Sequence, residues 1–202
     1  MEIYLIRHTT PAIERGVCYG QTDIDITSTF EEEALAIKQH ISSSIQNVYS
    51  SPLQRCSKLA YYLFPSHHIQ HHAHLMEVNC GEWEMKKWND IPQEISNAWM
   101  NDFVNNPFPG GENYVQLHRR VITVFNQVFE TKIASAIIAH GGVLRSIMSH
   151  ITQTSLNNSF NKFNIHYGCV IKLHYTNGDW QIEYLHNIKP AEKETHKPIV
   201  KP

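Results

Sequence analysis

Two short β-prone runs, far apart in the chain, both finish at a histidine. Glu2–Ile6 leads into Arg7 and His8, and Ala134–Ala139 leads into His140 and two glycines. Apolar runs that end abruptly at charged or turn-forming residues are typical of strands buried on both faces of a sheet. We therefore predict two buried strands, each of which presents a histidine at its carboxyl end.

The rest of the chain alternates between strand and helix patterns. We expect a short strand at Asn47–Ser50 and a hairpin whose strands, Cys169–Tyr175 and Trp180–Leu185, flank an Asn-Gly-Asp turn. Apolar residues at helical spacing predict helices within Phe30–Ile45, Val115–Phe129 and Val143–Ile151. This alternation predicts an α/β fold with a mostly parallel central sheet and helices on both faces.

Polar residues predict where two of the helices begin. Ser28 or Thr29, each followed three positions on by a glutamate, predicts a capping box before the first helix. Ser51 and Pro52 predict the cap and first residue of a second helix, which places Arg55 in its opening turn.

Composition narrows the class of protein. The 202 residues are 42% hydrophobic and carry a formal net charge of −2, which fits a globular domain and argues against binding to nucleic acid or an anionic membrane. No stretch reaches the ~18 apolar residues of a membrane span, and no signal peptide is recognisable. We expect a domain at 1–188, a mobile Lys-, Glu- and Pro-rich tail at 189–202, and a cytoplasmic location. The four cysteines are then expected to be reduced: Cys18, Cys56, Cys80 and Cys169.

Three predicted strand ends or helix starts carry a cation or a histidine. These are Arg7 with His8, then Arg55, then His140. Ligands of open α/β sheets gather at the carboxyl ends of the strands, and helix N-termini favour anions. Arginine also binds phosphate oxygens two at a time. The pattern therefore predicts a site for a tetrahedral phosphate dianion.

An imidazole in such a site can act as a nucleophile. His8 would attack phosphorus to form a phosphohistidine that water then opens. The two arginines and the second histidine would offset the charge on the oxygens, with no metal or other cofactor. The leaving alkoxide needs a proton, for which Glu77, beside apolar residues, is the candidate donor, with Glu82 and Glu84 as rival acids.

Five segments occur in an order that resembles the histidine phosphatase (phosphoglycerate mutase-like) superfamily. They are Leu5–His8, Ser50–Arg55, Glu77–Glu84, Pro109–Glu112 and Ala139–Gly142. The resemblance implies a three-layer sandwich, with His8 as the nucleophile and Glu77 as the general acid and later the base. It also implies a phosphate pocket made by Arg7, Arg55 and His140.

The residue after the predicted nucleophile departs from the family pattern. Thr9 stands where the family usually has glycine. A β-branched residue would be strained there if the backbone needed a positive φ, so we expect the loop to run differently in this chain. Within the loop Cys18–Asp23, Tyr19 and Gln21 are candidates for hydrogen bonds to phosphate.

Two segments resemble one subgroup of the superfamily. The Tyr-Gly-Gln-Thr-Asp loop at 19–23 and the Gly-Glu-Trp-Glu-Met segment at 81–85 are most similar to the alpha-ribazole phosphatases of cobalamin biosynthesis. The resemblance implies the 5′-phosphate of a nucleotide-like small molecule as substrate. The alternatives are a broad-specificity phosphatase, an isomerase of the phosphoglycerate mutase type, and a non-catalytic phospholigand sensor. A homodimer is left open.

Some residues favour structural roles over chemical ones. His67–His74 contains histidine pairs at i, i+4 spacing that a helix could present to zinc, but it holds no cysteine or acidic ligand. We expect an irregular polar segment there, without a metal. Glu112 is expected in the first turn of a helix. Trp83 and Trp88 are expected in the core or the pocket wall.

Overall fold

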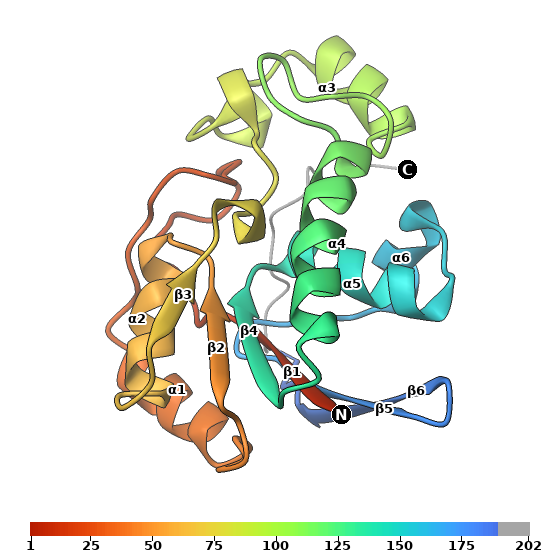
Figure 1. Ribbon diagram of the computed structural model, residues 1–202. Coiled ribbons are helices and arrows are strands. Elements are labelled where there is room, and N and C mark those ends of the chain that lie inside the picture. The colour runs from red at the N-terminus through yellow and green to blue at the C-terminus, as the bar shows by residue number, and fades with distance from the viewer. Residues whose placement is uncertain (190–202) are drawn as a thin grey trace.

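A six-stranded sheet lies at the centre of residues 1–189, the part of the chain that this computed structural model describes (Figure 1). Its order is β3-β2-β4-β1-β5-β6, in which the first four strands run parallel and the last two form an antiparallel hairpin. The strands are β1 (Glu2–Arg7), β2 (Asn47–Ser50), β3 (Ile69–His71), β4 (Ser135–Ala139), β5 (Val170–Thr176) and β6 (Asp179–His186).

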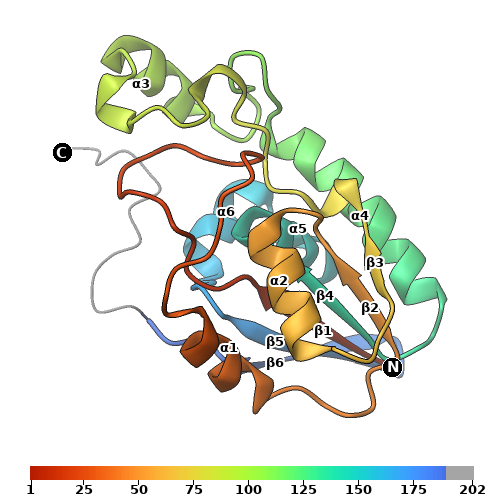
Figure 2. The ribbon, with the colours of Figure 1, turned by 90° about the vertical axis from the view of Figure 1, so that its left-hand side faces the viewer.

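Helices cover both faces of this sheet, which confirms the predicted three-layer α/β fold (Figure 2). Ile3 and Leu5 of β1 share one core cluster with residues of α4 (Tyr114–Glu130) and α5 (Gly141–Thr152). Tyr4 and Ile6 share the other with residues of α1 (Phe30–Lys38) and α2 (Gln54–Leu63). Because successive side chains of a strand point to opposite faces, a strand covered on both sides is apolar throughout. The helices are α1 (Phe30–Lys38), α2 (Gln54–Leu63), α3 (Gln93–Asn101), α4 (Tyr114–Glu130), α5 (Gly141–Thr152) and α6 (Leu156–Lys162).

The connection between β3 and α4 lies above the carboxyl ends of the parallel strands and carries α3 (Figure 1). Aromatic side chains pack it together: Trp99 and Phe108 have ring centroids 4.5 Å apart, and Trp83 is edge-on to Trp88. Both Trp83 and Trp88 are buried, as predicted. This segment also carries Glu77, so its packing decides where that carboxyl group lies.

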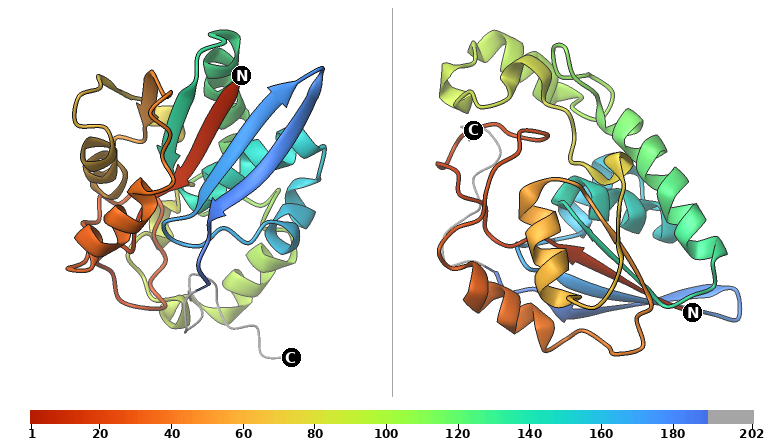
Figure 3. Two further views of the ribbon diagram at one scale, coloured as in Figure 1. Left: turned by 90° about the horizontal axis from the view of Figure 1, so that it is seen from below. Right: turned by 60° about the vertical axis from the view of Figure 1, so that its left-hand side comes forward.

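The hairpin predicted near the end of the described chain is confirmed. It forms one edge of the sheet, with β5 antiparallel to β1 (Figure 3). Its turn residues Asn177 and Gly178 have φ values of 52° and 91°, the left-handed pair that two-residue hairpin loops require. Within residues 1–189 no helix has both the length and the apolar character needed to cross a membrane. The tail predicted at 189–202 falls, from residue 190 on, outside the described residues.

The capping bonds predicted at the two helix starts are not observed. Thr29 is the N-cap residue of α1, one of the two predicted, but its hydroxyl donates to the Glu33 carboxylate at 2.6 Å and caps no backbone group. Helix α1 ends at Lys38, so the expected helix up to Ile45 stops early. The N-cap of α2 is Leu53 and not Ser51, because the Ser51 hydroxyl bonds to a distant histidine. Arg55 nevertheless lies in the first turn of α2, as predicted.

Two local expectations need further correction. His67–His74 is not irregular throughout, since it contains the strand β3 and most of a short 3-10 helix at Ala73–Leu75; no α-helix presents its i, i+4 histidine pairs on one face. Within residues 1–189 no three His, Cys, Asp or Glu side chains gather where they could hold a metal ion. Glu112 lies just before Asn113, the capping residue of α4, and not in the first turn.

Candidate active site

His8 follows β1 and is held by backbone and side-chain hydrogen bonds. Its N–H donates to the Ala139 carbonyl at 3.1 Å, and its carbonyl accepts from Gly168 at 3.0 Å. The imidazole Nδ1 lies 2.7 Å from the Thr9 carbonyl oxygen. A carbonyl only accepts, so Nδ1 carries the proton and the neutral ring has its lone pair on Nε2. The side chain is only 2% exposed.

The residue after His8 carries no backbone strain. Among the described residues other than glycine, positive φ values occur only at Met85, Lys132, Gln153 and Asn177. Thr9 is therefore in an ordinary conformation, and the condition under which a β-branched residue would be strained there does not arise. Its side chain is completely buried.

His140 lies beside His8, as the two strand ends predict. The ring centroids are 5.1 Å apart, with the rings edge-on. His140 Nε2 lies 2.8 Å from the Ser51 hydroxyl and 3.4 Å from the Cys56 thiol. Burial, followed by the positive charge of Arg55, holds the pKa of His140 well below its ordinary value. At neutral pH the ring is therefore a hydrogen-bonding group and not a cation.

Arg7 is positioned at the start of α5. Its guanidinium packs on the Tyr167 ring at 3.9 Å, and Nη1 donates to the Ile165 carbonyl at 2.6 Å. A Cβ built on Gly141 would lie 3.5 Å from the guanidinium carbon. The charge of Arg7 thus lies next to the helix N-terminus, where backbone N–H groups also favour an anion.

Arg55 is fully buried and binds the loop that follows His8. Nη1 donates to the Thr22 carbonyl at 2.9 Å, and Nη2 donates to the Gly20 carbonyl at 2.6 Å. Its Nε has no hydrogen-bond partner among the described residues. Buried polar groups are almost always hydrogen-bonded, so this N–H has donor capacity left for a bound ligand.

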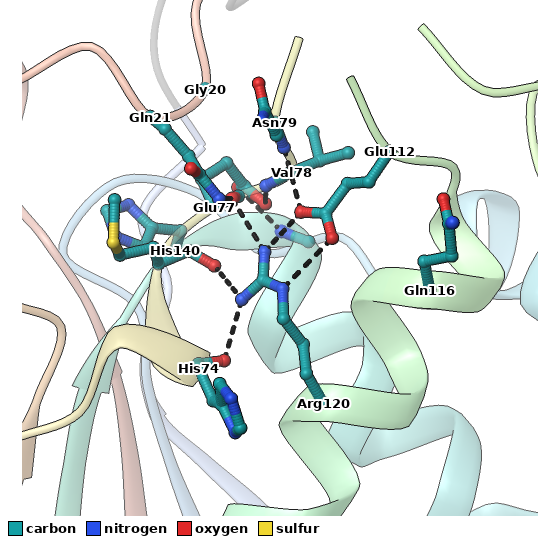
Figure 4. Close-up of polar contacts among 12 residues, drawn as sticks. Gly20, Gln21, His74, Glu77, Val78, Asn79, Glu112, Gln116, Arg120 and His140 are labelled. Carbon is teal, nitrogen blue, oxygen red and sulfur yellow. Dashed lines mark hydrogen bonds and ion pairs between the residues drawn. The ribbon is translucent and has the colours of Figure 1, made fainter. Parts of the chain in front are cut away.

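Glu77 contacts the same helix start. Its Oε2 accepts the N–H of Gly142 at 3.0 Å, and its Oε1 accepts the N–H of Val78 at 3.0 Å. Gly142 is two residues after His140, so the predicted acid and the predicted phosphate pocket meet at the N-terminus of α5 (Figure 4). The structure therefore brings together all five residues of the predicted site: His8, Arg7, Arg55, His140 and Glu77.

Tyr19 and Gln21 lie at the site in different ways. The Tyr19 hydroxyl is 2.8 Å from that of Tyr167, and burial raises its pKa, which keeps the phenol neutral. Gln21 instead donates its side-chain amide to the Glu77 carbonyl at 3.1 Å (Figure 4). A bond from either residue to phosphate stays a prediction. Tyr167 was not expected, because a single tyrosine before a strand has no sequence signal of its own.

Glu84, an alternative candidate for the general acid, instead binds the backbone of the loop at 20–22. Its carboxylate accepts the N–H groups of Gly20, Gln21 and Thr22 and the Thr22 hydroxyl, at 2.6–3.2 Å. It also accepts the N–H of Cys80 at 3.1 Å. Burial would raise the pKa of Glu84, but these hydrogen bonds outweigh it and lower the pKa. Glu84 is thus an ionised anchor for the loop at 20–22.

Two further residues that contact the site were not predicted from the sequence. Ser51 and Cys56 both contact His140, and both side chains are buried. Burial raises the pKa of the Cys56 thiol to about 12, so it stays protonated. All four cysteines are buried, and within residues 1–189 no disulfide links them to one another.

The order of the motifs and the geometry of the site agree with a comparison of whole sequences. A sequence model of the histidine phosphatase superfamily (branch 1) matches residues 3–188. The chain belongs to this superfamily. It is accordingly a phosphatase, an enzyme that hydrolyses phosphoric monoesters.

Several named proteins are similar to this histidine phosphatase. A protein of Hydrogenobacter thermophilus, provisionally named phosphoserine phosphatase 2, is 28% identical over 167 residues, covering 79% of this chain and 82% of its own. The metal-independent phosphoserine phosphatase of Arabidopsis thaliana is 28% identical over 166 residues, covering 76% and 70%. The structure of the alpha-ribazole phosphatase of Shigella flexneri superposes with a TM-score of 0.81 at 22% identity, covering 92% and 96%.

The buried His140 should make the fold sensitive to acid. In the unfolded chain this ring takes up a proton as the pH falls through its ordinary value of 6.5, whereas the folded chain resists protonation. We therefore expect the free energy of unfolding to decrease below pH 6.5, by up to about 1.4 kcal/mol per pH unit from this residue. Urea denaturation at a series of pH values should show a shallower decrease for His140→Asn. Equal slopes would contradict the prediction. The free energy of unfolding of His140→Asn should still depend on pH, because other histidines also have lowered pKa values: His72, His118 and His186.

Proposed function

We propose that this phosphatase transfers the phosphoryl group of a small phosphate ester to Nε2 of His8. The observation that carries the proposal is the bond from His8 Nδ1 to the Thr9 carbonyl, which leaves the nucleophilic lone pair on Nε2. The N–P bond forms as the ester P–O bond breaks. Glu77 gives its proton to the leaving alcohol, then takes one from the water that releases phosphate and restores His8.

The surrounding groups are suited to the charge of the transferred phosphoryl. Arg7 and Arg55 supply two buried positive charges, and the first N–H groups of α5 add a partial one. His140 contributes a neutral ring. Because these groups can balance the charge on the equatorial oxygens, we propose turnover without a metal ion.

For the substrate we propose alpha-ribazole 5′-phosphate. The two segments that resemble the alpha-ribazole phosphatases, at 19–23 and 81–85, form one unit in space, since Glu84 binds three N–H groups of the loop. The half-buried Tyr19 extends from this unit beside Arg55, with 5.4 Å between guanidinium carbon and ring centroid. L-phosphoserine is the second candidate, because both sequence relatives named above are phosphoserine phosphatases by name.

A panel of phosphate esters tests this proposal. Free phosphate release is measured with alpha-ribazole 5′-phosphate, L-phosphoserine, 2- and 3-phosphoglycerate and p-nitrophenyl phosphate, each with and without EDTA. We expect the highest kcat/KM for alpha-ribazole 5′-phosphate and no effect of EDTA. A preference for phosphoserine would overturn the substrate, and EDTA inhibition would overturn the metal-free mechanism. Phosphoglycerate interconversion without phosphate release would indicate an isomerase, and ligand binding without turnover would indicate a sensor.

A further inference from the structure

The segment that carries Glu77 has little regular structure of its own. Between the short 3-10 helices at Ala73–Leu75 and Gly81–Trp83, residues 76–80 are neither helix nor strand. A carboxyl group that must donate a proton has to be held within a fraction of an ångström of its productive position. Some other part of the fold must therefore fix this stretch of backbone.

Arg120, on α4, makes that connection (Figure 4). Its Nη1 donates to the carbonyls of His74 and Met76, each at 2.7 Å, and its Nη2 donates to the carbonyl of Glu77 at 2.8 Å. The remaining Nη2 and Nε hydrogens go to the carboxylate of Glu112. All five N–H groups of the guanidinium are thus used, three of them on the segment that ends at Glu77.

Glu112 holds the other side of Glu77. Its Oε1 accepts the N–H of Asn79 at 2.9 Å, and its own N–H donates to the Asn79 carbonyl at 3.0 Å. The backbones pass so closely that a Cβ on Gly111 would lie 2.3 Å from the Asn79 carbonyl oxygen, so only glycine fits. The Pro-Gly-Gly-Glu motif at 109–112 therefore clamps the backbone around Glu77.

The pairing depends on the shape of arginine as well as on its charge. The side chains of Arg120 and Glu112 are 16% and 15% exposed, so solvent screens their attraction only in part. A planar guanidinium can grip a carboxylate with two parallel bonds and still reach three carbonyls, whereas a lysine has three donors on one nitrogen. A lysine at position 120 would keep the positive charge but could not bind the carboxylate and the three carbonyls at once.

We propose that Arg120 and Glu112 are positioning residues for the general acid. They fix the backbone on both sides of Glu77 and thereby aim its carboxyl at the leaving group. This inference rests on the proposed role of Glu77, and Arg120 acts on the reaction only through that side chain.

Esters whose leaving groups differ in basicity can distinguish a positioning role of Arg120 and Glu112 from a merely structural one. The variants are Arg120→Lys and Glu112→Gln, with Arg119→Lys as a matched control, because Arg119 is the adjacent, exposed arginine of α4. We expect the single-turnover rate of His8 phosphorylation to fall about 10²-fold for the fastest alkyl ester of the panel, with substrate affinity little changed. With p-nitrophenyl phosphate, whose leaving group needs no proton, this rate should stay near wild type. The first step is measured by itself because the later release of phosphate from His8 uses Glu77 as a base with either ester. Thermal melting of each variant confirms that it is folded at the assay temperature.

A double-mutant cycle with Glu77→Gln completes the test. If Arg120 acts through Glu77, Arg120→Lys should cause no further loss on the alkyl ester once Glu77 is glutamine. Equal losses on both esters in Arg120→Lys and Glu112→Gln, or additive losses in the double variant, would overturn the positioning role alone. If Glu77→Gln itself slows His8 phosphorylation equally with both esters, the assignment of Glu77 as the acid fails, and this inference fails with it.

Discussion

Replacing His8 by alanine should abolish both turnover and the phosphorylated intermediate. The imidazole is the protein group that bonds to phosphorus in the proposed mechanism, and Nε2 of the neighbouring His140 is engaged with Ser51. Loss of a nucleophile typically costs on the order of 10⁴-fold or more in kcat. We expect a loss of this size with every ester, alkyl or aryl, since bond formation to phosphorus is common to all of them.

Labelling measures the intermediate directly. The protein is mixed with a ³²P-labelled ester and denatured at alkaline pH, because acid destroys an N-linked phosphate. Wild type and His68→Ala should retain label, and His8→Ala should not; His68 is an exposed histidine remote from the site and serves as the matched control. Equal labelling of wild type and His8→Ala would contradict His8 as the nucleophile.

Replacing Gly142 by alanine should cause the second largest loss, although alanine normally favours a helix. A Cβ on Gly142 would lie 2.3 Å from Glu77 Oε1 and 3.2 Å from its Cδ. The carboxyl group must then move away and give up its bond to the Gly142 N–H. Because general acid catalysis contributes about 10²- to 10⁴-fold, we expect a loss in that range on alkyl esters.

The preference of helices for alanine over glycine provides a control for the Gly142→Ala prediction. In an unconstrained helix, alanine would be more stabilising than glycine by about 1 kcal/mol. If Gly142→Ala keeps its far-UV circular dichroism and its rate of His8 phosphorylation by p-nitrophenyl phosphate, but loses this rate with alkyl esters, the displaced acid explains the loss. Unchanged alkyl ester hydrolysis would contradict the proposed position of Glu77.

The parts of this site that sequence could predict are those determined locally. A buried strand that ends at a charged residue places His8 and His140 from a few neighbouring residues, and both predictions of position are confirmed. Arg55 follows from the start of a helix, even though the exact start was wrong. The roles of these residues in catalysis remain predictions.

The predictions that failed involve partners distant in the sequence. Ser51 has the side chain of a helix cap, but its hydroxyl bonds to His140, 89 residues away. The bond from Gln21 to the backbone of Glu77, 56 residues away, was likewise not predicted. The strand β3 has only three residues and exists by pairing with β2, so its local pattern is weak. Tertiary hydrogen bonds decided each case, and a local pattern does not contain them.

The loop at 20–22 lies between opposite charges. Arg55 binds its carbonyls and Glu84 binds its N–H groups, so the peptide dipoles are aligned by the fold itself. The conformational entropy of ordering this loop is therefore lost on folding and not when a ligand arrives. The side chain of Tyr19, a candidate for substrate binding, therefore extends from a stretch of backbone that is already ordered in the folded chain.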